Sequence, residues 1–203
     1  MIILSVVCLA YLTGSIPTGF IAGRLKGVDV RKHGSGNVGA TNVARVVGKL
    51  PGLLVLWVDA AKGWVPVALL APKAVELGSP IPIDSLRILL GVAAVAGHIW
   101  NPFLQFQGGK GVAPAIGVLI GLDGRVALGT FIVWLAAAGW TRYVSVASIS
   151  AALAAPFLML LFGAPTAWVL GCIGVSLAIL WRHRPNMLRL LQREEHRIGS
   201  PKK

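Results

Sequence analysis

The chain has 203 residues, of which 56% are hydrophobic and only 13% are charged. This composition excludes a soluble domain with an ordinary polar surface and indicates a polytopic helical membrane protein. The formal net charge of +12 belongs on cytoplasmic loops that face anionic lipid headgroups, so no nucleic-acid partner is predicted. The two cysteines, Cys8 and Cys172, lie inside apolar runs, and neither a disulfide nor a metal site is expected.

Seven apolar segments are the predicted membrane helices. They cover residues 2–22, 51–71, 83–99, 111–122, 126–140, 144–162 and 166–181. Most Lys and Arg residues fall between residues 24 and 49 or after residue 181, and the positive-inside rule assigns both segments to the cytoplasm. The chain is therefore predicted to be an all-α integral membrane protein that forms a single polytopic domain over residues 1–203, with its N-terminus outside and its C-terminus cytoplasmic.

Two of these predicted helices are irregular. Residues 14–17 (GSIP) are expected to kink the first one, because Pro17 removes a backbone donor. Residues 111–122 are too few to cross a hydrocarbon core of about 30 Å unless the bilayer thins locally.

The first cytoplasmic segment contains the run GSGNVGATNVAR at residues 34–45. The helical period puts the valines of this region on one face and Thr41, Asn42 and Arg45 on another. An interfacial helix of this kind would present its polar residues beside a glycine-rich, anion-binding loop. An ordinary loop followed by a capped amphipathic helix fits the same pattern.

The second predicted helix carries two ionisable residues, Asp59 and Lys62. Residues three apart are neighbours on one helix face. Charges at this depth are costly, so the pair is predicted to have a functional or architectural role. Two simpler explanations would also account for charged residues in this helix. The two side chains could merely neutralise each other, or the Lys62 side chain could extend to the membrane interface.

A loop rich in glycine follows the third predicted helix, which ends near His98. Its candidate anion-binding residues are Gly108, Gly109, Lys110 and Gly111. The positive end of a helix that begins near Gly111 adds to the lysine charge, which predicts a phosphate site. A Walker A loop is excluded, because that motif needs glycine where this chain has Leu104 and Ser or Thr where it has Gly111. A flexible cytoplasmic turn is the simpler alternative.

The C-terminal tail is basic, and residues 183–195 (HRPNMLRLLQREE) form its third polar motif. Pro185 can open a helix that places Asn186, Arg189 and Arg193 close to one face. A basic juxtamembrane helix that binds anionic lipid would show the same pattern.

The predicted topology puts all three polar motifs on the same side of the membrane. In order, they resemble the three cytoplasmic motifs of the membrane-embedded bacterial acyl-phosphate:glycerol-3-phosphate acyltransferase family. The resemblance covers essentially the whole chain, including residues 14–17 and the segment 59–63. The chain departs from the family pattern at Val38, Gln107, Pro114 and Arg193, where the family usually has Pro, Lys, Thr and Gly.

The resemblance implies transfer of a fatty acyl group from acyl phosphate to the 1-hydroxyl of glycerol 3-phosphate. The products would be lysophosphatidic acid and inorganic phosphate, in the first step of phospholipid biosynthesis. It implies no cofactor, contact with membrane lipids, and a location in the bacterial inner membrane with the active site facing the cytoplasm.

The two cationic loops are assigned to the two phosphate-bearing substrates. Residues 108–111 are expected to hold the phosphate of acyl phosphate, with their backbone amides and Lys110 stabilising charge on the leaving group. The residues expected to position glycerol 3-phosphate are Ser35, Asn37, Thr41, Asn42 and Arg45, completed by His183, Asn186 and Glu195 from the tail. Arg45 suits bidentate binding of a phosphate, and Glu195 would orient a cation.

The acceptor of the hydroxyl proton is left open by the sequence. His98 and His183 titrate in a suitable range, but an oxygen of the leaving phosphate could accept the proton instead. The candidate catalytic residues are therefore Ser35, His98, Lys110 and His183. Direct transfer without an acyl-enzyme is favoured, because neither cysteine lies near a motif and Ser35 has no evident base partner in the sequence.

Two other classes of protein fit parts of the pattern. A transporter or channel for a phosphorylated small molecule would need polar residues near the bilayer midplane on several helices, and the predicted helices offer few beyond Asp59 and Lys62. A non-catalytic membrane subunit or lipid-binding scaffold would not need three polar motifs on one side of the membrane.

Overall fold

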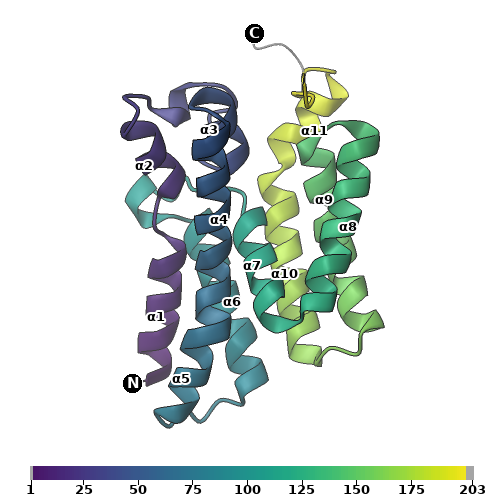
Figure 1. Ribbon diagram of the computed structural model, residues 1–203. Coiled ribbons are helices and arrows are strands. Elements are labelled where there is room, and N and C mark those ends of the chain that lie inside the picture. The colour runs from purple at the N-terminus through teal and green to yellow at the C-terminus, as the bar shows by residue number, and fades with distance from the viewer. Residues whose placement is uncertain (1, 200–203) are drawn as a thin grey trace. The chain divides into compact units, whose positions relative to one another are not determined.

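The computed structural model describes residues 2–199, and within this range the chain folds into helices and turns without any strand (Figure 1). It divides into two compact units, Met1–Leu122 and Asp123–Lys203, where the sequence predicts one domain over residues 1–203. Each unit is described by itself.

The first unit contains most of the polar residues singled out in the sequence. Its helices are α1 (Ile2–Gly14), α2 (Thr18–Arg24), α3 (Ala40–Val46), α4 (Lys49–Val65), a π-helical turn (Pro66–Leu70), α5 (Ala71–Glu76), α6 (Ile83–Ile99) and α7 (Val112–Leu122), with 3-10 turns at Val30–Lys32 and Pro102–Leu104. The π-helical turn begins at Pro66, which has no N–H to donate to the carbonyl of Lys62. The helix continues through it, so Lys49–Glu76 forms one apolar segment of 28 residues.

The predicted kink in the first helix is a complete break. α1 ends at Gly14 and α2 begins at Thr18, with Pro17 between them in a non-helical conformation. Regular helical hydrogen bonding is interrupted here, and the carbonyls of Ser15 and Ile16 accept hydrogen bonds from side chains elsewhere in the fold.

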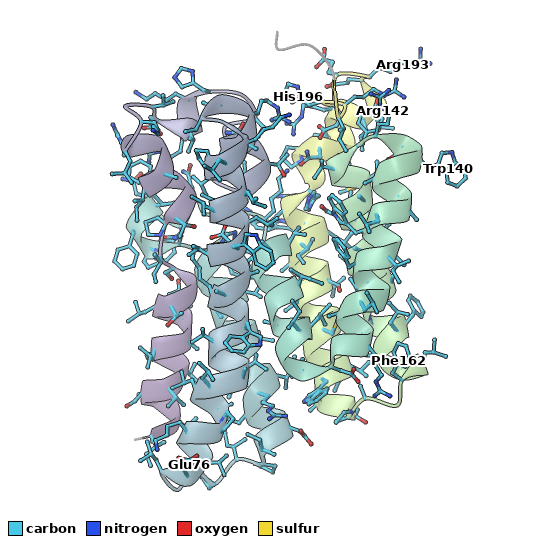
Figure 2. All side chains as sticks on the ribbon, in the orientation of Figure 1. Glu76, Trp140, Arg142, Phe162, Arg193 and His196 are labelled. Atoms are coloured by element: carbon cyan, nitrogen blue, oxygen red, sulfur yellow. The ribbon has the colours of Figure 1, made fainter. Side chains whose placement is uncertain are left out.

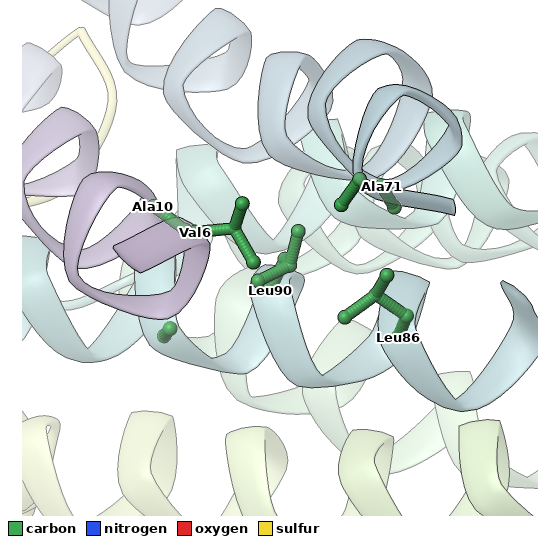
Figure 3. Close-up of a cluster of buried hydrophobic side chains, with 7 residues drawn as sticks. Val6, Ala10, Ala71, Leu86 and Leu90 are labelled. Atoms are coloured by element: carbon green, nitrogen blue, oxygen red, sulfur yellow. The ribbon is translucent and has the colours of Figure 1, made fainter. Parts of the chain in front are cut away.

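Small and branched apolar side chains fill the core between α1, α5 and α6 (Figure 3). This cluster consists of Val6, Ala10, Ala71, Ala74, Leu86, Leu90 and Ala93. Many larger apolar side chains, among them Leu4 and Trp57, are exposed on the outer faces of the helices. Such an arrangement suits helices whose outer faces contact lipid.

Two glycines allow α4 and α7 to approach closely. A methyl group added at Gly63 of α4 would lie 2.0 Å from the carbonyl oxygen of Pro114, and one added at Gly117 of α7 would lie 1.8 Å from that of Ala60. Close approach at small residues is a common way for membrane helices to pack. It fixes α7 beside the C-terminal part of α4.

Over its described residues, 123–199, the second unit contains four helices, α8 (Gly124–Thr141), α9 (Val144–Leu161), α10 (Thr166–Arg182) and α11 (Arg184–Leu191). α10 and α11 meet at a bend of 48°. Figure 2 shows that Arg142, Arg193 and His196 lie at one end of this unit and Phe162 at the other.

By length and composition, the described chain contains five or six of the seven predicted membrane helices. Five helical segments of the described chain are long and apolar enough to cross a membrane: Ile2–Arg24, Lys49–Glu76, Ile83–Leu104, Gly124–Thr141 and Val144–Leu161. The bent pair of α10 and α11 makes a sixth if it counts as one crossing. α7 has only 11 residues, about 17 Å of helix, so the predicted crossing at residues 111–122 falls short of a full span.

The close contact between α4 and α7 predicts a specific sensitivity to added volume. Gly117→Ala is expected to destabilise the fold by about 1–3 kcal/mol, because the new methyl group meets a backbone carbonyl that cannot rotate away. Thermal unfolding of the purified protein in detergent measures this. Gly139→Ala is the matched control, since no atom lies within 4 Å of the added methyl group. Equal unfolding temperatures for the two variants would contradict the packing.

Candidate functional site

Asn42 organises the loop that precedes α3. Its side-chain NH₂ group donates to the carbonyls of Val30 at 3.0 Å, His33 at 3.1 Å and Asn37 at 2.9 Å, while its Oδ1 accepts the N–H of Ser35 at 2.9 Å. The residue is only 1% exposed. One amide side chain therefore closes the loop through four backbone groups, and its polar atoms are used inside the loop.

The other predicted residues of this motif are displayed on the loop that Asn42 holds. Ser35 is half-buried and Thr41 is exposed. Arg45 reaches back to Asn42, with 3.4 Å between Nη1 and Oδ1. Gly34 has a positive φ of 61°, and a methyl group there would lie 2.3 Å from Asn42 Oδ1. A side chain at this position would therefore disturb the hydrogen bonds that shape the loop.

Asp29 braces the chain just before this loop. It caps the 3-10 turn at Val30–Lys32 by accepting the Arg31 N–H, and it also pairs with the Arg31 guanidinium at 2.8 Å. The hydrogen bond from the Arg31 side chain holds the pKa of Asp29 well below its usual range. Arg24 and Arg31 both stack on the ring of Phe20 in α2.

The glycine-lysine loop, residues 108–111, is anchored to the end of α6. The N–H of Gly108 donates to the carbonyl of Ile99 at 3.1 Å, and that of Gly109 to the carbonyl of His98 at 3.0 Å. The expectation that these two amides face a bound anion therefore needs correction, because both donate to α6. Gly111 turns the chain into α7 with a φ of 87°, and the loop delivers Lys110 directly before the first turn of that helix.

A buried polar cluster lies beside this loop, built around Asp59 and Lys62. Their carboxylate and ammonium groups form an ion pair, with side chains 2% and 3% exposed. Lys62 also donates to the carbonyl of Ile16 and, at 2.9 Å, to the hydroxyl of Thr18, which in turn donates to Asp59. The pair therefore supplies hydrogen-bond partners to the break between α1 and α2.

His98 lies between this cluster and the glycine-lysine loop. Its Nδ1 is 3.9 Å from Asp59 Oδ1, and its Nε2 would be 2.0 Å from a methyl group at Gly109. The residue is 7% exposed. A candidate base predicted from the sequence is thus enclosed between a carboxylate and the loop backbone.

Asn101 is a polar residue that sequence reasoning did not single out. Its side-chain NH₂ donates to the carbonyl of Ser15 at 2.6 Å, and its Oδ1 accepts the N–H of Phe103 at 3.0 Å. The Ser15 hydroxyl lies 3.2 Å from the carbonyl of Gly97. These bonds tie the helix break to the end of α6. An asparagine directly before a proline at a helix end was the available signal.

The tail residues form their own network in the second unit. Asn186 donates to Glu195 Oε1 at 2.7 Å, and Arg189 donates to Glu195 Oε2 at 2.8 Å. His183 is buried, with its Nδ1 2.8 Å from the carbonyl of Ile179. A carbonyl only accepts, so this contact puts a proton on Nδ1. Glu195 therefore orients both Asn186 and Arg189.

Burial and hydrogen bonding act in opposite directions on Glu195. Burial alone would raise the pKa of the carboxyl group, but the hydrogen bonds from Asn186 and Arg189 and the charge of Arg189 outweigh it and lower the pKa. The group is accordingly a carboxylate at neutral pH.

Comparison with known proteins identifies the family. A family model described as glycerol-3-phosphate acyltransferase matches residues 4–193. The glycerol-3-phosphate acyltransferase 2 of Moorella thermoacetica is 46% identical over 192 residues, which cover 94% of this chain and 95% of that protein. The chain belongs to the glycerol-3-phosphate acyltransferase family.

Other relatives agree with this family assignment. The glycerol-3-phosphate acyltransferase of Aquifex aeolicus is 45% identical over 195 residues, covering 96% of this chain and 98% of that protein. Two crystal structures of PlsY, an integral membrane glycerol 3-phosphate acyltransferase, are similar in fold. The glycerol 3-phosphate form has a TM-score of 0.89 and 45% sequence identity, and the match covers 97% of this chain and 96% of that one. The lysophosphatidic acid form has a TM-score of 0.86 and 44% sequence identity, and the match covers 97% of this chain and 95% of that one. The resemblance inferred from the three motifs is confirmed.

The hydrogen bonds of Asn42 predict that Asn42→Asp opens the loop that precedes α3, the first of the two cationic loops in this unit. A carboxylate there would face three carbonyl oxygens with no proton to donate. Trypsin is expected to cut faster after the exposed Arg31 and Lys32, by about tenfold for a local destabilisation of about 1.4 kcal/mol. Time-resolved digestion of the purified protein measures this. Thr41→Asp adds the same charge at an exposed neighbour, and an equal effect there would contradict the role of Asn42.

The lowered pKa of Glu195 predicts a pH-dependent effect of Glu195→Gln. A lowered folded-state pKa stabilises the fold above the ordinary value of 4.5, and this contribution disappears as the pH falls through the folded pKa. The variant is therefore expected to unfold several degrees below the wild type at pH 7, with the gap closing towards pH 3. Glu194→Gln, at an exposed neighbour, is expected to show little difference at either pH. A gap for Glu195→Gln that persists unchanged in acid would contradict the assignment.

Proposed function

We propose that this chain transfers a fatty acyl group from acyl phosphate to the 1-hydroxyl of glycerol 3-phosphate, forming lysophosphatidic acid and releasing inorganic phosphate. The observation that carries the proposal is the anchored glycine-lysine loop, which presents Lys110 at the N-terminus of α7 in an integral membrane member of the acyltransferase family. A phosphate attached to an acyl chain suits such a site, because its apolar part is soluble in the lipid around it.

The phosphate of the acyl donor binds at Lys110 and the first turn of α7 in this proposal. The amides of Gly108 and Gly109 are engaged with α6, so backbone capture of the anion falls to the amides that follow Lys110. The helix N-terminus adds its partial positive charge to the ammonium group. Together they stabilise the negative charge that grows on the phosphate as it leaves.

Glycerol 3-phosphate binds at the loop that Asn42 shapes. Arg45 supplies a planar donor for its phosphate, and Ser35, Asn37 and Thr41 supply short polar groups for the glycerol hydroxyls. The family resemblance also assigns His183 and Asn186 to glycerol 3-phosphate, and within the second unit Glu195 orients Asn186.

The transfer step is direct. The 1-hydroxyl oxygen attacks the acyl carbon, the bond between that carbon and the phosphate oxygen breaks, and the phosphate leaves with the electron pair. The hydroxyl proton passes to a phosphate oxygen. Enclosure of His98 between Asp59 and Gly109 favours this route over the imidazole as base, and no covalent acyl-enzyme forms.

The proposed orientation places the two loops and the tail in the cytoplasm and the N-terminus outside the bacterial inner membrane. The basic residues of 24–49 and of the tail support it through the positive-inside rule. α7 is a short seventh membrane helix in this arrangement, entering the bilayer from the phosphate site.

The role of Lys110 is tested by phosphate release from palmitoyl phosphate, with and without glycerol 3-phosphate. The wild type is expected to release phosphate only with glycerol 3-phosphate and to form lysophosphatidic acid. Lys110→Ala is expected to lower kcat by about 10²–10³, the usual loss for one donor to a developing anion. Lys49→Ala, at an exposed lysine at the start of α4, is the matched control.

Two outcomes would overturn the proposal. Folded wild-type protein that releases no phosphate would remove the acyl-phosphate reaction. Accumulation of an unchanged phosphorylated solute inside sealed vesicles would replace catalysis with transport.

A further inference from the structure

The imidazole of His98 fills the space on one side of the glycine-lysine loop. The three heavy atoms nearest to a methyl group added at Gly109 all belong to the His98 ring: Nε2 at 2.0 Å, Cε1 at 2.8 Å and Cδ2 at 2.9 Å. The same residue holds Gly109 through its backbone, because its carbonyl accepts the Gly109 N–H at 3.0 Å. The position of Gly109 is therefore set from two directions by one residue.

The neighbouring Gly108 is packed in a different way. A methyl group there would meet the backbone carbonyl oxygen of His98 at 2.0 Å and that of Ile99 at 2.8 Å. These atoms belong to the main chain at the end of α6 and stay in place whatever side chain residue 98 carries. The ring thus acts on Gly109 and the main chain acts on Gly108.

The opposite edge of the ring faces the buried ion pair. Nδ1 of His98 lies 3.9 Å from Asp59 Oδ1, the same oxygen that receives the Lys62 ammonium and the Thr18 hydroxyl. α4 also touches the helix that follows the loop, because Gly63 packs against the carbonyl of Pro114 in the first turn of α7. One stretch of α4 therefore lies against the His98 ring beside Gly109 and against the start of α7 after the loop.

We propose that His98 is a positioning residue, whose ring transmits the fixed position of the Asp59–Lys62 pair to Gly109 and so places Lys110 against the leaving phosphate. This inference rests on the proposed function of the loop and assigns His98 a steric role in place of a role in proton transfer. The ring sets how closely the loop approaches α6, and Lys110 follows one residue later.

A pair of reciprocal substitutions tests this inference. Gly109→Ala is expected to displace the loop and lower kcat/KM for palmitoyl phosphate on the order of a hundredfold, the usual effect of a misplacement of about 1 Å. His98→Ala is expected to cost about tenfold through loss of support. The double variant is expected to recover about tenfold relative to Gly109→Ala, because the new methyl group occupies space that the ring has vacated.

The matched control repeats the cycle at Gly108. His98→Ala is expected to give no recovery of Gly108→Ala, since the obstacle there is main-chain oxygen. A general base at His98 gives the opposite pattern, in which the double variant at Gly109 is no more active than either single variant and His98→Ala alone loses about 10²–10⁴. That pattern would overturn the inference.

Thermal unfolding of the same variants separates this inference from the proposed function. In the Gly109 cycle, the double variant is expected to lose less unfolding temperature than the two single variants lose in sum, in line with its recovered activity. In the Gly108 cycle, the changes in unfolding temperature are expected to add. Non-additivity with an inactive wild type would count against the proposed acyl transfer alone. Additive unfolding temperatures together with an active wild type would count against the role of His98 alone.

Discussion

The buried ion pair of Asp59 and Lys62 is the interaction on which the first unit depends. Removing two charges from water costs several kcal/mol for each ion, and the attraction between them offsets this only when the remaining donors and acceptors also find partners. Lys62 finds them at the carbonyl of Ile16 and the hydroxyl of Thr18. The Ile16 carbonyl can accept from Lys62 because Pro17 interrupts helical hydrogen bonding at that point. The helix break and the ion pair therefore require each other.

Both loops of the first unit are tied to this break. On one side, Asn101 and Gly97 bond to Ser15 and hold the end of α6, from which the glycine-lysine loop starts. On the other side, α2 lies against the first loop, where a methyl group at Gly19 would be 1.7 Å from the carbonyl of Val38. Two loops assigned to different substrates thus share one anchor inside the apolar part of the unit.

The sequence predicts the helices and the polar motifs well, but it does not predict how the motifs are held. Hydropathy and the 3.6-residue period are local signals, and they locate the apolar helices and mark Asp59 and Lys62 as exceptional. They place Asn42 on a polar face without showing that its amide turns back to Val30 and His33. The contact of Lys62 with Ile16 joins residues 46 apart in the chain, and no local pattern encodes it.

The glycines of the second loop show how a correct motif can be given an incorrect physical reason. Glycine next to lysine suggests backbone amides that face an anion, yet Gly108 and Gly109 turn their amides towards α6. Both positions need glycine because other atoms lie very close. Gly108 lies against main-chain carbonyl oxygens, and Gly109 lies against the His98 ring. Gly111 is different, because its positive φ lets the chain turn into α7. Two glycines thus fix where the loop lies and the third fixes where the helix begins, so the charge of Lys110 and the positive end of α7 meet at one place.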